Sequence, residues 1–304
     1  MNNKSQTRLK KQDFTFPDKK DSEKFKTRIQ RFYEFLNQKL NTSIYCEYAI
    51  FMNWGYEPDG NPNYAKVELP EHFLNKRSTR LILELVGDFD LKGAKVLDVG
   101  CGRGGTLYTL SQFYQAKTLT GIDITDANIK FCRQNFDGEP IEFHKGDAEN
   151  LPFADNEFDI LTNVESSHVY PNLFKFYREV YRVLKPGGYF LYTDIFPNQE
   201  LPDFLTYLQE VGLSLELERD ITNNVILSRE LDAENQMGAL AISEEETAEN
   251  QEQEENIQAH KHVMALPGSD LYERLKLQEY GYRIYRLKKQ SKPISTVKSS
   301  AALY

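Results

Sequence analysis

Between residues 78 and 225, short apolar or β-branched runs alternate with longer amphipathic stretches. Such alternation is typical of βα units, in which parallel strands are joined by helices that cover the sheet. It therefore predicts an α/β fold with a doubly wound, mostly parallel sheet. The seven runs that predict strands are 95–99, 118–122, 141–145, 158–163, 189–194, 213–219 and 282–287.

Two of the helices expected between these strands have recognisable ends. One begins at Thr125 and Asp126, whose side chains can cap the N–H groups of a first turn, and runs towards Asn135. A second covers Leu173–Leu184 with an apolar stripe at helical spacing. The Lys-Pro-Gly-Gly sequence at 185–188 is expected to end it.

Composition excludes several classes of protein. In 304 residues, 40% are hydrophobic, which is enough for a buried core. No apolar run approaches the roughly 20 residues of a membrane helix, and the polar N-terminus does not resemble a secretory signal, so we expect a cytoplasmic protein. Cys46, Cys101 and Cys132 have no metal-site or disulfide spacing, so no metal is expected.

The net charge of −9 is unevenly distributed along the chain. Residues 230–255 contain 10 acidic residues and neither Lys nor Arg, so the acidity belongs to this segment. Residues 1–28 carry 9 Lys or Arg against 4 Asp or Glu. The net charge of −9 argues against a nucleic-acid partner. Because residues 1–28 are poor in apolar residues, a solvated arm is favoured there over an RNA-binding tail.

These observations divide the chain into six parts. The central part is a core at 76–230, completed by a final segment with the last strand at 267–290. An aromatic cover segment and an acidic, Gln-rich insertion or lid are expected around it. The flanking parts are the basic, disordered arm at 1–28, the cover segment at 29–75, the insertion at 231–266 and the tail at 291–304.

A glycine-rich turn follows the first strand of the core. Gly100, Gly102 and Gly104 come directly before a predicted helix, and their lack of Cβ atoms lets backbone N–H groups approach a ligand closely. The same stretch also satisfies the dinucleotide pattern G-x-G-x-x-G, with Asp123 about 20 residues later. The turn alone therefore indicates a nucleotide-type cofactor without identifying it.

A dehydrogenase is the main rival interpretation of this turn, because Tyr181 and Lys185 match a Tyr-x-x-x-Lys pair. However, Tyr181 falls on the apolar stripe of its helix, which favours core packing. Asp98 precedes the first glycine by two residues, where its carboxylate would repel a pyrophosphate and attract a positively charged cofactor. The charge pattern thus favours a cationic cofactor.

The glycine-rich turn is the first of five motifs that occur in order along the core. They are 96–104, Gly121-Ile122-Asp123, Gly146-Asp147-Ala148 with Asn150-Leu151-Pro152-Phe153, Phe158-Asp159-Ile160, and 184–190. With them the chain resembles class I S-adenosylmethionine-dependent methyltransferases. The resemblance implies a Rossmann-like, seven-stranded sheet with N-terminal and inserted cover elements, and S-adenosylmethionine as cofactor.

The resemblance also implies the cofactor-binding residues. Asp123 would bind both ribose hydroxyls, because a carboxylate offers two acceptor oxygens. Ile124 would pack on the adenine, and Asp147 with Ala148 would read its amino edge. The remaining expected cofactor residues are Asp98, Gly100, Cys101, Gly102, Gly104 and Asn163.

Catalytic candidates follow the fourth predicted strand, where α/β folds place their chemistry. Methyl transfer requires a positioned nucleophile and removal of its proton. His168 is the predicted general base, since a neutral imidazole titrates near the working pH. Glu165 is predicted either to orient His168 or to contact the substrate.

The loop from Glu165 to His168 is similar to that of small-molecule methyltransferases. Together with 53–56 and 267–287, it resembles tailoring O-methyltransferases of polyketide and nonribosomal peptide pathways, including the phthiotriol type. This implies O-methylation of a hydroxyl on a small natural product. The residues predicted to contact that substrate are Tyr45, Trp54, Tyr56 and Tyr170.

Other activities stay open at this point. C-methylation of a sterol-like or quinone-like substrate would use a similar loop, and carboxylate methylation would need no base. A catalytically inactive, cofactor-binding partner subunit is the non-enzymatic alternative, which the intact Asp98, Asp123 and His168 argue against. The sequence gives no indication of the oligomeric state.

Overall fold

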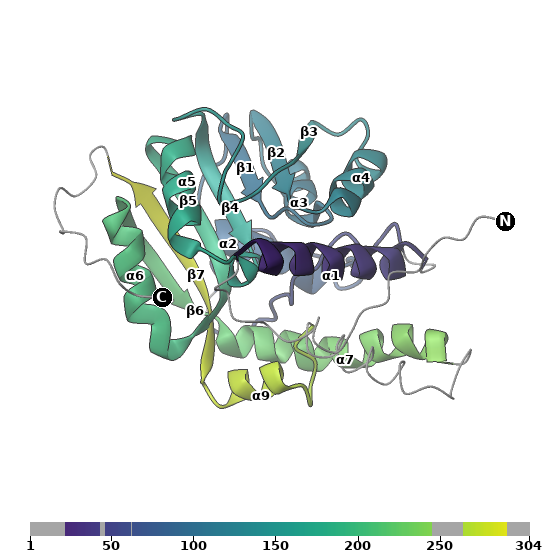
Figure 1. Ribbon diagram of the computed structural model, residues 1–304. Coiled ribbons are helices and arrows are strands. Elements are labelled where there is room, and N and C mark those ends of the chain that lie inside the picture. Colours follow the sequence, from purple (N-terminus) through teal and green to yellow (C-terminus); the bar gives the residue numbers. More distant parts are fainter. Residues whose placement is uncertain (1–21, 43–45, 62, 245–263, 291–304) are drawn as a thin grey trace.

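The structure is a computed structural model that describes residues 22–42, 46–61, 63–244 and 264–290. Within these ranges, seven strands form one sheet in the order β3-β2-β1-β4-β5-β7-β6 (Figure 1). The strands are β1 (Lys95–Val99), β2 (Thr118–Asp123), β3 (Ile141–Lys145), β4 (Phe158–Val164), β5 (Leu184–Pro197), β6 (Leu213–Asp220) and β7 (Tyr280–Lys289).

Strands β1 to β5 pair in parallel, whereas β7 is antiparallel to both β5 and β6. The predicted doubly wound α/β sheet is therefore confirmed. Because β1 to β5 are parallel, their carboxyl ends lie at one edge of the sheet. The topology reverses between β1 and β4, which is where such sheets bind ligands.

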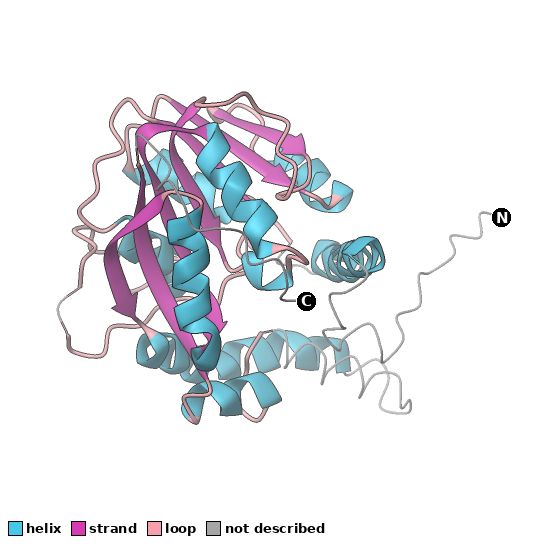
Figure 2. Ribbon diagram, turned by 60° about the vertical axis from the view of Figure 1, so that its left-hand side comes forward, coloured by secondary structure: helices cyan, strands magenta, loops and turns pink. Residues whose placement is uncertain are grey.

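Side chains of the strands alternate between two hydrophobic clusters, one on each face of the sheet. Val96 of β1 belongs to the first cluster and its neighbour Leu97 to the second. Helices cover both faces (Figure 2). Helices α2 (Lys76–Val86), α3 (Gly105–Phe113) and α4 (Asp126–Asn135) contribute to the first cluster, and α5 (Leu173–Val183) and α6 (Leu201–Glu210) to the second.

Two helix ends differ in detail from the sequence prediction: the N-terminal cap of α4 and the last residue of α5. Helix α4 begins at Asp126 as expected, but the side chain of Thr125 makes no capping hydrogen bond. Instead, the carboxylate of Asp123 accepts from the Thr125 N–H at 2.8 Å. Helix α5 ends at Val183, because Leu184 already pairs with Phe158 as the first residue of β5.

Three helices outside the sheet connections cover the core. The first, α1 (Ser22–Thr42), packs beside α4 (Figure 1). The others are α7 (Thr222–Glu244) and α9 (Asp270–Lys276), which pack against each other and against β7. Residues 22–28 of the arm expected at 1–28 are helical, because they form the first turns of α1. Lys26 in this segment pairs with Asp147 and Glu149 of the core.

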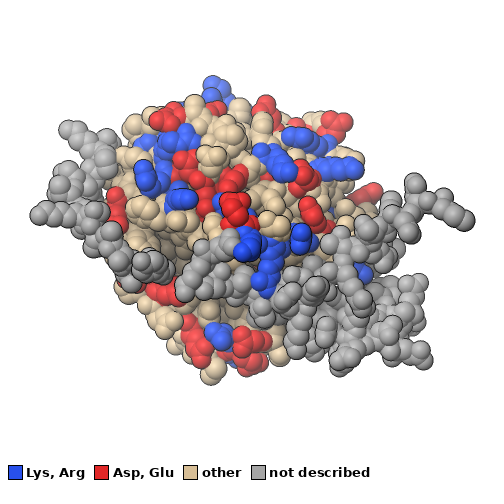
Figure 3. Space-filling model, in the orientation of Figure 1, with Lys and Arg blue, Asp and Glu red and all other residues tan. Residues whose placement is uncertain are grey.

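The acidic insertion expected at 231–266 is only partly described. Its first residues continue α7 without a break to Glu244, and residues 245–263 lie outside the described ranges. On the face drawn in Figure 3, acidic and basic side chains are interspersed among the described residues. No helix in the described part of the chain is long and apolar enough to cross a membrane.

Candidate active site

The glycine-rich turn leads from β1 into α3 at the carboxyl edge of the sheet. Gly100, Gly102 and Gly104 have φ values of 73°, 51° and 84°, a left-handed conformation that favours glycine. The N–H groups of Gly100 and Cys101 both donate to the carbonyl of Ile122, at 2.8 and 3.0 Å. A Cβ atom on Gly100 would overlap the hydroxyl oxygen of Ser166, so glycine is required there.

Carboxylates stand at the ends of β1 and β2, beside this turn. Asp98 is 1% exposed and accepts from the hydroxyl of Thr162 at 2.6 Å. Burial raises the pKa of Asp98 to about 7, although the Thr162 hydrogen bond opposes this shift. Asp123 accepts from the N–H of Gly102 at 2.9 Å, and burial also raises its pKa. The turn is thus tied directly to the carboxylate predicted to bind ribose.

Asp147 follows β3 at the same edge. Its Oδ1 accepts from the N–H of Glu149 at 2.9 Å, and its Oδ2 pairs with Lys26 of α1 at 2.6 Å. Asp98 and Asp123 lie at the ends of β1 and β2, and Asp147 lies just after β3, so each of these three strands brings one carboxylate to this edge. Sequence reasoning assigned no role to Lys26, because nothing local relates residue 26 to residue 147.

Asn163 lies at the end of β4, next to the glycine turn. It is fully buried, and its Nδ2 donates to the Val99 carbonyl at 2.7 Å and to the Ser166 hydroxyl at 2.7 Å. Among the described residues, its Oδ1 has no hydrogen-bond partner. The Tyr170 hydroxyl lies within 3.2 Å of the same amide nitrogen, so this predicted substrate residue borders the glycine turn.

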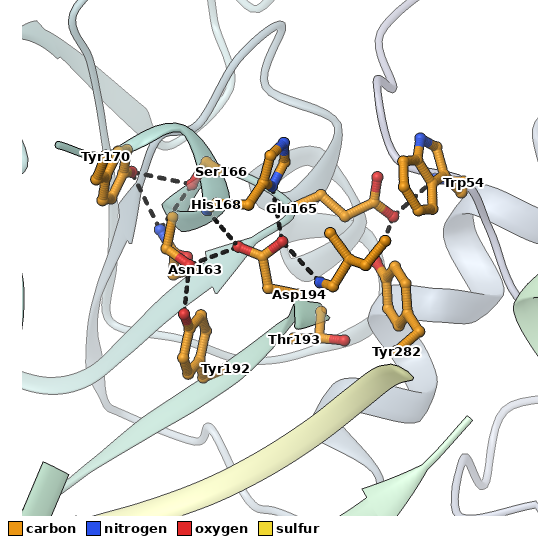
Figure 4. Close-up of polar contacts among 12 residues, drawn as sticks. Trp54, Asn163, Glu165, Ser166, His168, Tyr170, Tyr192, Thr193, Asp194 and Tyr282 are labelled. Carbon is orange, nitrogen blue, oxygen red and sulfur yellow. Dashed lines mark hydrogen bonds and ion pairs between the residues drawn. The ribbon is translucent and has the colours of Figure 1, made fainter. Parts of the chain in front are cut away.

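His168 is oriented by a carboxylate from the neighbouring strand (Figure 4). Its Nδ1 lies 2.8 Å from Oδ1 of Asp194, and its backbone N–H lies 3.1 Å from Oδ2. Asp194 is fully buried; burial opposes its ionisation, but the charge and hydrogen bond of His168 outweigh this and lower its pKa. An ionised Asp194 only accepts, so in the neutral imidazole the proton resides on Nδ1 and Nε2 carries the basic lone pair.

Asp194 was missed in the sequence because its partner lies 26 residues away. One signal was present: a carboxylate interrupts the apolar run of β5, which otherwise reads Tyr-Phe-Leu-Tyr-Thr before it and Ile-Phe after it. Ser167 donates to the same carboxylate at 2.5 Å, and Ile195 N–H donates to it at 2.8 Å. A fully buried carboxylate with this many donors is held in one orientation.

Glu165 is held by groups from two other segments of the chain, and its two predicted roles, orienting His168 or contacting the substrate, stay predictions. Its carboxylate accepts from the Trp54 backbone N–H at 2.8 Å and from the Tyr282 hydroxyl (Figure 4). Glu165 has a φ of 47°, a conformation that costs a non-glycine residue about 1–2 kcal/mol. Burial raises its pKa to about 7 despite the two hydrogen bonds. Strain and burial together are typical of a functional site.

The other residues expected to contact the substrate lie in different surroundings. Trp54 is 4% exposed, with its ring against Tyr282 at a centroid distance of 5.8 Å. Tyr56 is buried in the core, where burial and the nearby Glu84 raise its pKa to about 12. A contact of Tyr56 with the substrate stays a prediction. Tyr45 lies outside the described residues.

Tyr33 of α1 is a further residue that sequence reasoning missed. Burial and the charges of Asp123, Asp194 and Glu165 all raise the pKa of its hydroxyl. Asp123 belongs to the predicted ribose site, whereas Asp194 and Glu165 lie near His168. The Tyr33 hydroxyl is therefore close enough to both regions to feel their charges. A phenol in this environment keeps its proton and can act as a hydrogen-bond donor.

Comparison with known proteins agrees with this geometry. Residues 97–192 match a methyltransferase domain family. The chain is 40% identical over 187 residues to a fatty-acid O-methyltransferase of Mycolicibacterium smegmatis, covering 61% of this chain and 68% of that one. It is 38% identical over 190 residues to a phthiotriol/phenolphthiotriol dimycocerosates methyltransferase of Mycobacterium tuberculosis, covering 60% and 70%. The chain belongs to the class I S-adenosylmethionine-dependent methyltransferases.

Solved structures extend the similarity of this methyltransferase to nearly its whole fold. The [4+2]-cyclase SpnF aligns with a TM-score of 0.65 over 88% of this chain and 97% of that one, at 19% sequence identity. At that identity the likeness concerns the fold alone. Because the matched structure is a cyclase, the acceptor chemistry has to be argued from the residues of this site.

The residues at the carboxyl edge fit S-adenosylmethionine. Asp98, Asp123 and Asp147 offer acceptors to an ammonium group, a ribose diol and an adenine amine, respectively. The buried Oδ1 of Asn163 is an additional acceptor that has no donor among the described residues. Where they are ionised, the carboxylates at this edge of the sheet also create a negative potential, which favours a sulfonium cation.

No group of three or more His, Cys, Asp or Glu side chains is arranged to hold a metal ion within the described residues. The remaining predicted cofactor residues lie around the same turn. Cys101 and Ala148 are buried, and the carbonyl of Ile124 accepts from Gln30 of α1 at 3.4 Å. Their contacts with the cofactor stay predictions.

Proposed function

We propose that this methyltransferase methylates a hydroxyl oxygen on a lipid-like or polyketide-type small molecule, with His168 as general base. The observation that carries the proposal is the pair formed by His168 Nδ1 and Asp194 Oδ1 at 2.8 Å. Such a pair gives imidazole a fixed orientation and a single basic nitrogen, as a general base requires. His168 keeps 23% of its side chain exposed, so it is accessible from the site.

S-adenosylmethionine supplies a methyl group on a positively charged sulfur, which departs as a neutral thioether. The protein must then place the acceptor oxygen in line and take its proton. Nε2 of His168 accepts the hydroxyl proton as the oxygen becomes methylated. The imidazolium formed is stabilised by the buried carboxylate of Asp194, which bears the opposite charge.

The substrate class is supported by the two relatives, which are named for a fatty acid and for phthiotriol dimycocerosates. Both names describe large, mostly apolar acceptors. Tyr170, which is partly exposed beside the glycine turn, provides apolar surface for such a molecule, and the buried rings of Trp54 and Tyr282 pack against each other beside Glu165.

A carboxylate acceptor is the second candidate, favoured by the relative that is named a fatty-acid O-methyltransferase. A carboxylate is already deprotonated at neutral pH, so it needs no base. In that case His168 would be dispensable for proton removal.

The two candidates are separated by assaying radiolabelled methyl transfer to a long-chain secondary alcohol and to a fatty acid of equal chain length. For the alcohol, we expect His168→Ala to lower turnover about 10²- to 10⁴-fold, the usual contribution of a general base. Asp194→Asn should lower it as well and weaken its pH dependence. S-adenosylhomocysteine binding, followed by calorimetry, should stay close to that of the wild type.

His144→Ala is a matched control, because His144 lies on β3 with its side chain 43% exposed, and its described contacts are an ion pair with Glu142 and an edge-to-face contact with Phe153. It should leave turnover unchanged. If His168→Ala retains full activity on the alcohol, the proposed base is wrong. If only the fatty acid is methylated, and without dependence on His168, the carboxylate candidate replaces the hydroxyl one.

A further inference from the structure

We propose that Lys26 of α1 is a positioning residue for the cofactor: it holds Asp147 in place to accept a hydrogen bond from the adenine amino group. The proposal rests on the predicted role of Asp147. Its basis is a three-residue cluster in which Lys26 Nζ lies 2.6 Å from Asp147 Oδ2 and 2.9 Å from Glu149 Oε2.

Helix α1 presents one polar face to the cofactor-binding loops. Lys26, Gln30, Tyr33 and Asn37 are spaced by four, three and four residues, which places them on one side of a helix. Lys26 and Gln30 contact loops at the carboxyl edge, and Asn37 contacts helix α4. Lys26 reaches the loop after β3, Gln30 donates to the Ile124 carbonyl at 3.4 Å, and Asn37 donates to Asn128 at 2.5 Å.

The turn of the glycine loop is attached to the same helix. Arg103 is 1% exposed, and its guanidinium donates to Asn37 at 2.7 Å and to Asn41 at 2.9 Å. Helix α1 is therefore fixed at both ends of the predicted cofactor site: at the glycine turn through Arg103 and at the adenine end through Lys26. This makes α1 a wall of that site.

Lys26 has a specific electrostatic task at the adenine end. The carboxylates of Asp147 and Glu149 are both within 3 Å of its ammonium group, and without it two negative charges would face each other. Burial opposes the charge on Lys26, but its hydrogen bonds and ion pairs with the two carboxylates prevail and raise its pKa. Only 14% of the Lys26 side chain and 4% of the Glu149 side chain are exposed, so solvent screens this cluster weakly.

The cluster also fixes the direction of Asp147. Its Oδ1 is held by the Glu149 N–H and its Oδ2 by Lys26, while 32% of the side chain stays accessible. Each carboxylate oxygen can accept a second hydrogen bond. An ionised, oriented carboxylate selects a ligand that presents an N–H donor and rejects one that presents an acceptor.

Calorimetry with two probes tests this inference: S-adenosylhomocysteine, and S-inosylhomocysteine, in which an oxygen replaces the adenine amino group. The wild type should prefer the adenosyl compound by roughly 10- to 100-fold, as a charge-assisted hydrogen bond predicts. Lys26→Met should reduce this preference about tenfold. Lys26→Arg should restore most of it, because arginine keeps the positive charge.

Lys39→Met is the matched control, since Lys39 lies in the last turn of α1, beside the Phe35 ring. It should leave the preference unchanged. If Lys26→Met weakens binding of both probes equally, Lys26 merely fastens α1 and the positioning role is overturned. An unchanged preference in Lys26→Met overturns it too.

Asp147→Ala separates this inference from the assignment on which it rests, because alanine removes the acceptor. If that variant keeps the full wild-type preference, Asp147 does not read adenine, and the underlying prediction fails. If Asp147→Ala loses the preference while Lys26→Met retains it, Asp147 reads adenine unaided and only the role of Lys26 is wrong. Loss in both variants supports the proposal.

Discussion

The two halves of the site are built differently. In the cofactor half, the carboxylates after β2 and β3 accept hydrogen bonds from N–H groups two residues further along the chain, Thr125 for Asp123 and Glu149 for Asp147. In the acceptor half, His168 meets Asp194 across 26 residues, and Glu165 accepts from Trp54 across 111. In the first half, two carboxylates accept hydrogen bonds within their own loops, although Lys26 and Gly102 also reach them from other segments, whereas the second half is assembled by the packing of the sheet.

This difference explains why one half resembles a motif and the other does not. A loop that satisfies its own carboxylate needs particular residues at fixed short spacings. A pair such as His168 and Asp194 needs only that β4 and β5 lie side by side in the correct register, which Val164 and Thr193 provide. Three substitutions test this contrast, in order of expected effect.

The largest effect is expected from Asp123→Ala in the cofactor half. The substitution removes the acceptor predicted for two ribose hydroxyls and also the partner of the Gly102 N–H. With about 1.5–3 kcal/mol for each hydrogen bond to a charged group, S-adenosylhomocysteine should bind at least about 100-fold more weakly in calorimetry.

Asp126→Ala provides the control three residues further along the chain, at the start of α4, because Asp126 is exposed and pairs with Lys145. It should bind S-adenosylhomocysteine like the wild type. Binding by Asp123→Ala within a few-fold of the wild type would mean that the cofactor half does not depend on its local carboxylates.

A smaller effect, on stability, is expected from Glu165→Gln in the acceptor half. Burial raises the pKa of Glu165 from an ordinary 4.5 to about 7. Between these values the unfolded chain releases a proton that the folded chain keeps, so stability falls as pH rises. At about 1.4 kcal/mol per pKa unit, the wild type should lose about 3 kcal/mol through this group between pH 4 and 8.

Glu165→Gln should remove that share of the pH dependence, as measured by the free energy of unfolding in denaturant at several pH values. Glu142→Gln is the control, since the Glu142 side chain is 80% exposed. Parallel pH curves for the wild type and Glu165→Gln would show that this carboxyl group is not forced into its buried position by long-range packing.

The smallest effect is expected from Asn172→Ala, at the start of α5. The Asn172 side chain accepts from the Lys175 N–H at 2.9 Å and caps the helix. Its loss should lower the free energy of unfolding by about 1 kcal/mol, and Asn172→Ser should preserve most of it. Turnover should stay unchanged, because long-range contacts position His168; a large loss of turnover would show that the acceptor half depends on this local cap.

Sequence reasoning predicted the sheet, which the structure confirms, and the residues of the cofactor half, which stay predictions. All seven strands occur where the sequence runs predicted them. Strands β1 and β4 are buried along most of their length, so they are mostly apolar on both faces, whereas β6 alternates. The sequence did not decide the role of Tyr56, since aromatic residues suit a core and a substrate pocket equally. Sequence reasoning failed for residues 22–28, where a basic composition concealed the first turns of α1.

The sequence by itself predicted the cofactor half: the glycine turn, Asp98 and Asp123 at the ends of their strands, and Asp147 just after its strand. Only the tertiary structure decided that Asp194 orients His168, that Trp54 and Tyr282 hold Glu165, and that Lys26 pairs with Asp147. The physical reason is distance along the chain. Local hydrogen bonds leave a fixed spacing in the sequence, whereas contacts between remote segments depend on how strands and helices pack, and they leave none.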